Sequence, residues 1–285
     1  MPIVVTKLSH EYTAEGGALP YSAIKDIELT INDGEFLGII GHTGSGKTTF
    51  VQHLNGLLLP SSGSVTVDGL SLNDKKTRLS ARSLVGMVFQ YPEYQLFEET
   101  VYADVAFGPK NLKLDETEVD SRVREALELV GLPQEKFAQK SPFELSGGEK
   151  RRAALAGIIA MRPKYLVLDE PMAGLDPRGR KEILTMLETL RKDTGCAIIM
   201  VSHSMDDVSR HADRIMVLHR GVMAALGTPA EVFSDSDRLA DMGLSLPQAA
   251  ILAGELRKRG IEVPSSICTT VDMLSWLKGR LSAHA

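Results

Sequence analysis

A glycine-rich segment, Gly-His-Thr-Gly-Ser-Gly-Lys-Thr at residues 41–48, directly follows the apolar run 36–40 and precedes a helical pattern. This order of strand, loop and helix matches the phosphate-binding loop pattern in full. Glycines let backbone amides turn toward phosphate oxygens, and a helix N-terminus favours negative charge. A glycine-rich turn without a ligand is the alternative. The expected phosphate, nucleotide and magnesium contacts are Gly41, His42, Thr43, Gly44, Ser45, Gly46, Lys47, Thr48 and Thr49.

Within this loop, Lys47 is expected to reach the β and γ phosphates, and Thr48 to ligate Mg²⁺. A second motif, Tyr-Leu-Val-Leu-Asp-Glu at 165–170, places two carboxylates at the end of another buried strand, where an α/β sheet presents groups to its ligand. We predict that Asp169 holds Mg²⁺, usually through water, and that Glu170 activates the water that attacks the γ-phosphate. An Asp-Glu pair alone is more often a solvated strand end, so this prediction depends on the phosphate loop.

The apolar runs 36–40, 165–168 and 197–201 are continuous and separated by helical stretches, as in buried parallel strands of an α/β protein. Residues 27–31 and 64–67 alternate in polarity, which predicts antiparallel strands at one edge of a mixed sheet.

Helical periodicity over 116–130 and 147–161 predicts a helical subdomain, at about residues 91–162 of a domain spanning 1–227. Residues 228–285 are predicted to form a helical C-terminal extension. In this extension Thr228-Pro229 and the segment 245–248 each resemble a capped helix start, the second with capping-box spacing and an early proline. Val271, Leu274, Leu277 and Leu281 of this extension form an apolar stripe. We expect the stripe to pack either on the main domain or on another subunit, and the sequence favours neither.

Composition excludes several classes of protein. The 285 residues carry a net charge of −5 without an extended basic run, which argues against nucleic acid as a partner. The longest apolar stretch, 153–161, is far shorter than the roughly 18 residues of a membrane-spanning helix. The N-terminal residues lack the features of a secretory signal, which predicts a cytoplasmic protein. The two cysteines and seven histidines form no metal-ligand pattern, so a metal is expected to arrive with a ligand.

A third motif, Leu-Ser-Gly-Gly-Glu at 145–149, opens the helical segment 150–161. The phosphate loop, Gln90, this motif, Leu-Asp-Glu and His203 occur in an order that resembles the nucleotide-binding subunit of ATP-binding cassette (ABC) transporters over residues 1–227. The resemblance implies a P-loop NTPase (RecA-like) core that binds ATP and Mg²⁺. It also implies a head-to-tail dimer, in which each nucleotide lies between the phosphate loop of one subunit and four residues of the other, namely Ser146, Gly147, Gly148 and Glu149.

By the same resemblance, Tyr12 stacks on adenine and Asp176 crosses the dimer interface. Gln90 senses Mg²⁺ and the γ-phosphate and touches the membrane partner, while His203 contacts the γ-phosphate. Each has an alternative: a strand-core aromatic for Tyr12, a surface amide for Gln90 and a structural histidine for His203. The predicted catalytic set is Glu170, His203, Lys47 and Gln90, and the predicted metal set is Thr48, Gln90 and Asp169.

Two positions depart from the commonest ABC pattern. The signature has Glu149 where Gln is usual, and the turn after the strand has Met-Ala-Gly at 172–174 where Thr-Ser-Ala is commoner. Neither change removes a catalytic group. Because Glu170 and His203 are both retained, we expect hydrolysis rather than ATP binding alone.

The stretches Tyr-Pro-Glu-Tyr-Gln-Leu-Phe-Glu-Glu-Thr-Val at 91–101 and Asp-Val-Ala-Phe-Gly-Pro at 104–109 are similar to those in ATPases of energy-coupling factor (ECF) importers of vitamins and metal ions. The form of 91–97 resembles the second of two paired ATPases, which implies a heterodimer with a related ATPase; a homodimer remains open. The family also implies a transmembrane coupling protein, small substrate-capture membrane proteins and a peripheral place on the cytoplasmic face of the membrane.

Segment 91–108 is our candidate for docking the coupling protein, with ordinary subdomain packing as the alternative. Three other functions compete with the ECF assignment: the ATPase of a conventional importer with a dedicated permease, a soluble ABC protein acting on ribosomes or DNA, and an ATP-binding module without hydrolysis. The direction of transport follows from the resemblance alone, and the residues do not indicate the substrate.

Overall fold

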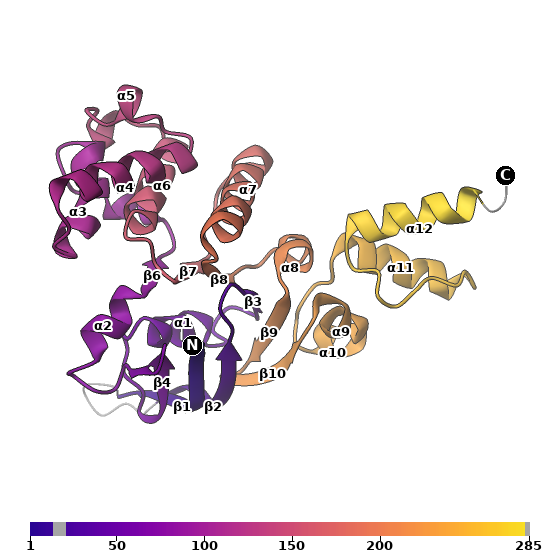
Figure 1. The fold of residues 1–285 in the computed structure, drawn as a ribbon. Coiled ribbons are helices and arrows are strands. Elements are labelled where there is room, and N and C mark those ends of the chain that lie inside the picture. The colour runs from indigo at the N-terminus through magenta and orange to yellow at the C-terminus, as the bar shows by residue number, and fades with distance from the viewer. Residues whose placement is uncertain (14–20, 283–285) are drawn as a thin grey trace.

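The structure is a computed structural model, and it describes residues 1–13 and 21–282. A six-stranded sheet forms its centre, in the order β10-β9-β3-β8-β7-β6 (Figure 1). Its strands are β3 (Phe36–Ile40), β6 (Val85–Val88), β7 (Tyr165–Asp169), β8 (Ala197–Val201), β9 (Arg214–His219) and β10 (Val222–Gly227). All neighbours pair in parallel except β9 and β10. The predicted parallel strands are therefore confirmed.

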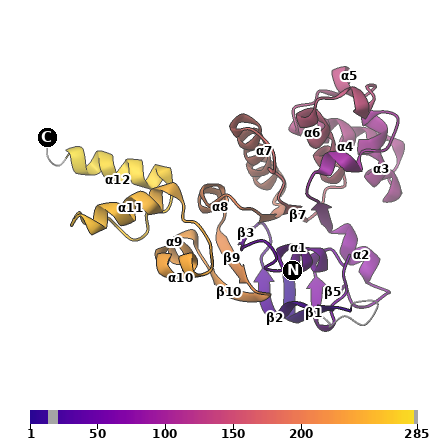
Figure 2. The same ribbon diagram turned by 180° about the vertical axis from the view of Figure 1, so that it is seen from behind.

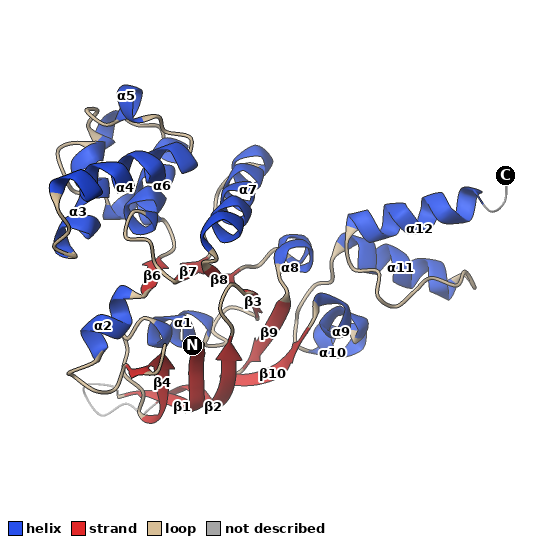
Figure 3. Cartoon of the chain, viewed as in Figure 1, coloured by secondary structure: helices blue, strands red, loops and turns tan. Residues whose placement is uncertain are grey.

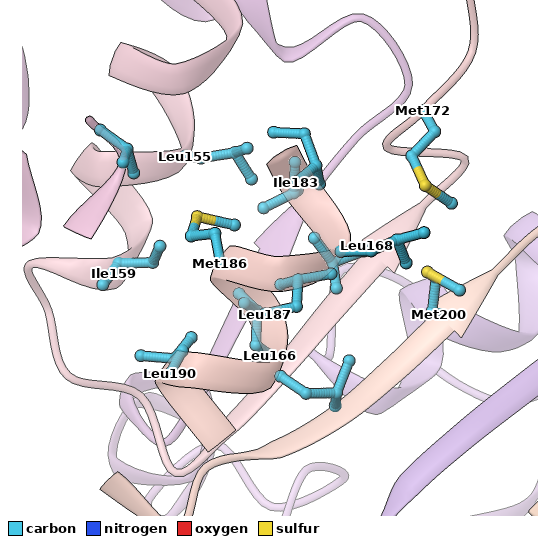
Figure 4. Close-up of a cluster of buried hydrophobic side chains, with 14 of the residues drawn as sticks. Leu155, Ile159, Leu166, Leu168, Met172, Ile183, Met186, Leu187, Leu190 and Met200 are labelled. Carbon is cyan, nitrogen blue, oxygen red and sulfur yellow. The ribbon is translucent and has the colours of Figure 1, made fainter. Parts of the chain in front are cut away.

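Helices cover both faces of this sheet, which explains why its central strands are apolar throughout. On one face, Leu166 and Leu168 of β7 pack with Leu187 of α7 (Pro177–Thr194), as Figure 4 shows. On the other face, Val167 joins a second cluster with Phe50 of α1 (Lys47–Leu54). The two clusters fix the strands between layers of side chains, so the strand ends are held rigidly.

The predicted strands at 27–31 and 64–67 exist, but they do not form an edge of the central sheet. They belong to a separate antiparallel sheet in the order β2-β1-β4-β5, visible below the centre in Figure 3. Its strands are β1 (Ile3–Tyr12), β2 (Tyr21–Ile31), β4 (Ser62–Val67) and β5 (Leu70–Ser71). Alternating residues of β2, Ile27, Leu29 and Ile31, enter the second apolar cluster. The central sheet is mixed, as predicted, but its antiparallel edge strand is β10.

The predicted helical region forms a lobe on one side of the sheets (Figure 1). In chain order, the elements between β5 and β7, apart from β6, are α2 (Arg78–Ser83), η1 (Pro92–Gln95), α3 (Val101–Asn111), α4 (Glu116–Leu129), α5 (Gln134–Phe137), η2 (Pro142–Glu144) and α6 (Gly147–Ile159). The periodic residues Val119, Val123 and Leu127 of α4 are buried in the first cluster, which also contains Leu166 of the central sheet. The lobe and the sheet thus share one apolar core.

The chain continues from α8 (Met205–His211) and β9–β10 into four helices, α9 (Pro229–Ser234), α10 (Ser236–Asp241), α11 (Gln248–Lys258) and α12 (Thr270–Ser282). Helix α9 starts at Thr228 as predicted, with a reciprocal capping box to Glu231. The segment 245–248 leads into a helix as predicted, but the predicted capping box is wrong: α11 begins at Gln248, with Pro247 and not Ser245 at the N-cap. Its first amide is satisfied from elsewhere in the fold, because Gln248 N donates to Asp206 Oδ1 of α8 at 2.9 Å.

The C-terminal helices are packed in two ways. Residues of α9 and α10, such as Phe233 and Leu239, join the first apolar cluster, whereas α11 and α12 form a small cluster of their own and extend away from the core (Figures 1 and 2). In the predicted stripe, Leu277 packs on that small cluster, and Val271, Leu274 and Leu281 are more than half exposed. None of the described helices has the length and apolarity needed to cross a membrane.

Gly38 of β3 provides a test of this packing. A Cβ at this position would lie 2.4 Å from Val208 Cγ1 and 3.3 Å from Ala212 Cβ, so Gly38→Ala forces β3 and α8 apart. We expect a loss of about 1–3 kcal/mol in the free energy of unfolding, measured by urea denaturation. Gly254→Ala is the matched control: a Cβ there meets no described atom within 4 Å outside its own helix, and alanine favours α11 by about 0.5–1 kcal/mol. Equal stability of the two variants would contradict this packing.

Candidate functional site

The phosphate loop lies between β3 and α1, as predicted. Gly44 and Gly46 have positive φ angles of 79° and 101°, which L side chains rarely adopt. A Cβ at Gly41 would lie 2.4 Å from Leu218 O, so the loop also packs too closely for a side chain there. Glycine is therefore required at 44 and 46 by the backbone angles and at 41 by the lack of space.

Lys47 is buried at the start of α1 and curls back over the loop. Its Nζ donates to Gly41 O at 2.8 Å and His42 O at 3.0 Å. Burial lowers the pKa of Lys47, and the charges of Glu170 and Asp169 oppose that shift. The cation is therefore held by two carbonyl oxygens of the loop, where the negative charge of a phosphate would stabilise it.

Two observations show that the loop suits a phosphate ligand. The fully buried hydroxyl of Ser45 forms no hydrogen bond with any described group. A buried polar atom without a partner is costly, and a bound phosphate oxygen is a partner of the right kind. The glycines leave a cradle of backbone amides around the N-terminus of α1, where anions are favoured.

The predicted metal residues also suit Mg²⁺. Asp169 is buried at the end of β7. Burial raises the pKa of Asp169, and the negative charge of Glu170 adds to this shift, whereas a hydrogen bond from Thr48 opposes it. A carboxylate beside a hydroxyl is the hard oxygen donor set that Mg²⁺ accepts, together with water and phosphate oxygens. Among the described residues, no group of three or more His, Cys, Asp or Glu side chains surrounds a metal position.

Three of the predicted catalytic side chains, those of Glu170, His203 and Gln90, come together next to Asp169. Glu170 follows β7, and its carboxylate is contacted from both neighbouring strands. His203 Nε2, after β8, lies 2.7 Å from Glu170 Oε1, and Gln90 Nε2, after β6, donates to Glu170 Oε2 at 3.4 Å. The backbone of Glu170 is in the left-handed region, with φ of 52°, and its amide donates to Val201 O at 3.2 Å. Such strain is typical of functional positions.

Tyr12 lies at the end of β1, close to the phosphate loop. Its hydroxyl is 3.2 Å from Thr49 Oγ1, and its ring meets the edge of His10 at 4.6 Å between centroids. The side chain is 43% exposed, so it is not the buried strand-core aromatic considered from the sequence. The side chain is therefore partly open to solvent beside the loop.

The signature residues lie apart from this cluster. Ser146 caps α6 in the helical lobe and is exposed, and no hydrogen bond among the described residues joins 146–149 to the loop 41–49. Asp176 caps α7, where its Oδ1 accepts from Gly179 N at 2.8 Å. One chain therefore assembles the loop, Asp169, Glu170, Gln90, His203 and Tyr12 at one site, and presents the signature at another.

An ion pair beside the site, between the buried Arg151 and the partly buried Glu93, was not predicted from the sequence. These residues are 58 positions apart, and no local pattern pairs them. Glu93 lies within the segment 91–101 that resembles the ECF ATPases, and Arg151 lies two residues after Glu149, but neither position indicates that the two side chains pair.

Comparison with known proteins gives the family. The ABC transporter family matches residues 24–173 of this chain. The chain is 54% identical to the energy-coupling factor transporter ATP-binding protein EcfA2 of Caldanaerobacter subterraneus subsp. tengcongensis, over 98% of this chain and 99% of the relative. It is 52% identical to the EcfA2 protein of Symbiobacterium thermophilum, over 100% and 98% of the two chains. The chain belongs to the ABC transporter family and, within it, to the ATP-binding proteins of ECF transporters.

Solved structures agree with this assignment. The cbiO1 protein of Clostridium perfringens, part of the ABC transporter complex cbiONQ, is 39% identical with a TM-score of 0.73, over 88% of this chain and 97% of that one. A dimeric ATP-binding cassette with bound ADP and Pi is 27% identical with a TM-score of 0.71, over 80% and 98%. The chain is thus an ABC ATPase with the predicted mixed-sheet fold, and it serves an ECF transporter.

The unusual Glu149 of this ECF ATPase takes part in a reciprocal cap. Its Oε2 accepts from Ser146 N at 2.8 Å and from Ser146 Oγ at 2.7 Å. The hydroxyl of Ser146, followed by its backbone amide, lowers the pKa of Glu149. The carboxylate therefore stabilises the folded state above its unfolded pKa, and this stabilisation is lost as the pH falls through the folded pKa.

Glu149→Gln tests this cap. The amide keeps an acceptor oxygen but loses the charge that favours a helix N-terminus, so we expect a loss of about 0.3–1 kcal/mol at pH 7, small because the group is exposed to solvent. The difference from wild type should shrink as the pH is lowered below 4.5, the ordinary glutamate pKa. Urea denaturation over this pH series measures it. Glu128→Gln, at the last turn of α4, removes one exposed carboxylate as a control and should not reproduce the effect.

Proposed function

We propose that this ATPase hydrolyses MgATP at the cluster around Glu170, and that hydrolysis powers an ECF importer at the cytoplasmic face of the membrane. The observation that carries the proposal is the double contact on Glu170, from His203 on one side and Gln90 on the other. A carboxylate held at two oxygens beside a phosphate loop is positioned to take a proton from an attacking water.

Each residue then has a distinct task. The amides of 41–46 and Lys47 hold the β and γ phosphates, and Thr48 and Asp169 hold Mg²⁺, which neutralises charge on the phosphates. His203 fixes the orientation of Glu170 and reaches the γ-phosphate, and Gln90 touches both Glu170 and the ligand. Tyr12 stacks on adenine. Hydrolysis proceeds when Glu170 accepts the proton of the in-line water, and the barrier is lowered mainly by the fixed charges and amides.

Glu170→Gln tests this assignment. Glutamine keeps the shape of the side chain and a contact for His203, but it cannot accept a proton, so we expect ATP affinity within a few-fold of wild type and a kcat lowered about 10²–10⁴-fold. Equilibrium binding of a fluorescent ATP analogue and phosphate release measure the two properties. Glu182→Gln, an exposed carboxylate of α7, is the control. Turnover near the wild-type rate in Glu170→Gln would refute the role of Glu170.

The separation of the signature from the phosphate loop supports a head-to-tail dimer. Ser146, Gly147, Gly148 and Glu149 of one subunit would close the nucleotide on the loop of the other, with Asp176 at the interface. We assign the partner as a related ABC ATPase, giving a heterodimer, on the resemblance of 91–97 to the second of two paired ATPases. The solved dimer with ADP and Pi is consistent with such closure.

The membrane partner is proposed to dock on segment 91–108. This segment borders a cavity of about 730 Å³ between α2 and β6 on one side and α3 and α6 on the other. Tyr94 is 84% exposed and Phe97 is 61% exposed, and Phe97 meets Phe107 edge to face at 5.0 Å. Exposed aromatic side chains around an apolar hollow are suited to bind an apolar helix. We assign this occupant as the transmembrane coupling protein, whose associated capture proteins bind vitamins or metal ions.

Charged substitutions test this surface. We expect Phe97→Asp to abolish recovery of membrane partners when the protein is trapped with ATP as Glu170→Gln and purified in mild detergent from its native membranes. With Glu170 left unchanged, Phe97→Asp should keep the ATPase activity of the isolated dimer within about twofold of wild type, because Phe97 follows η1 and is not one of the proposed ATP-binding or catalytic residues. Tyr94→Phe keeps the aromatic surface and should retain every partner.

The identities of the partners decide between the candidate transporters. A second ATPase, one shared membrane protein and several small membrane proteins support the ECF importer, and one dedicated permease would favour a conventional importer. Soluble partners alone would refute a transport role. Full recovery of membrane partners with Phe97→Asp would refute docking at this segment.

A further inference from the structure

Arg151 connects three segments that the chain keeps far apart in sequence. It projects from the first turns of α6, and its side chain is 5% exposed. Its Nε donates to Glu93 Oε2 at 3.0 Å and its Nη2 donates to Glu93 Oε1 at 2.7 Å, a bidentate pair. Its Nη1 donates to Ala173 O at 2.7 Å and Pro171 O at 3.4 Å. All three guanidinium nitrogens are thus used on two other segments.

Each connected segment leads to a different part of the proposed site. Glu93 lies in η1, within the docking segment and three residues after Gln90. Ala173 lies in the turn between Glu170 and Asp176. Arg151 itself lies on the helix whose N-terminus is the signature. The Tyr91 ring adds a further contact from the docking side, with its centroid 5.8 Å from the guanidinium carbon.

The pair is tight enough to transmit a displacement. Burial acts to raise the pKa of Glu93, but the hydrogen bonds from Arg151, a backbone hydrogen bond and the charge of Arg151 outweigh it and leave the pKa below its ordinary value, which favours the carboxylate form of Glu93. The guanidinium of Arg151 is buried and Glu93 is partly buried, so separating them would leave the buried cation without its carboxylate partner, which is unfavourable. A movement of η1 therefore carries Arg151, and with it the start of α6 and the turn 171–173, rather than breaking the contact.

We propose that Arg151, paired with Glu93, is a positioning residue that transmits docking of the membrane partner to the signature and to the turn before Asp176 of the same chain. The inference rests on the proposed function, since it takes the docking surface and the two interface elements from it. A merely structural ion pair would stabilise the fold without linking the two events.

The test compares the isolated ATPase with the complex purified from membranes, using MgATP as the only probe. In wild type we expect docking to change kcat for ATP by about fivefold or more, in either direction, with altered amide exchange at residues 146–149 and 176–179. In Arg151→Lys, which keeps the charge but cannot bridge both segments, we expect the two kcat values to agree within about twofold and the exchange to be the same in both states. Glu93→Gln, which changes the other member of the ion pair, should give the same two results as Arg151→Lys.

Arg152→Lys is the matched control, since Arg152 is the next residue of α6 and makes an ion pair of 3.1 Å with Glu182 of α7; it should retain the wild-type response. A wild-type response in Arg151→Lys and Glu93→Gln would overturn the proposal. The proposal would also be overturned if docking changed neither the kcat nor the amide exchange of the wild-type protein. Loss of the membrane partners from both variants would overturn it as well. Glu170→Gln in the same assay separates the two proposals, because turnover by that variant would refute the proposed function whatever Arg151 does.

Discussion

The parallel pairing of β6, β7, β8 and β3 determines where every proposed catalytic group lies. These strands run in one direction and in register, with Val88 beside Leu168 and Asp169 beside Val201. Their carboxyl ends therefore meet at one edge, and the residues that follow them are Gln90, Glu170, His203 and the phosphate loop. A shift of two residues in one strand would move its end by about 7 Å and separate these side chains.

This register is itself a result of burial. The central strands are apolar on both faces because helices cover both, so a shift would move large side chains out of complementary positions in two packed layers. The backbone of Glu170 shows how firmly the edge is held, because a non-glycine residue at φ of 52° persists only where its surroundings fix it. The core thus stabilises a local conformation that an isolated turn would not keep.

Much of the site could be predicted from sequence because each motif is local. The loop 41–48 and the strand end at 169–170 carry their chemistry within a few residues. The continuous apolar runs correctly predicted the parallel strands. The separate antiparallel sheet could not be read from alternation alone, since alternation shows that one face is buried but not which strands pair. The cap of α11 was misplaced at Ser245 because the acceptor for the first amide of the helix is Asp206, 42 residues earlier in the chain.

The same limit applies to the proposed docking segment 91–108, which is held by two carboxylates, the buried Asp104 and the partly buried Glu93. Near its end, the Asp104 carboxylate accepts from Glu98 N at 2.9 Å and Phe97 N at 3.2 Å, and near its start Glu93 is held by Arg151. Burial raises the pKa of Asp104, the expected cost of withdrawing a carboxylate from water. A chain that needed only a closed loop could use apolar packing there. The two charged groups instead fix both ends of the segment, because Asp104 holds the backbone at 97–98 and Arg151 holds Glu93 of η1 against α6.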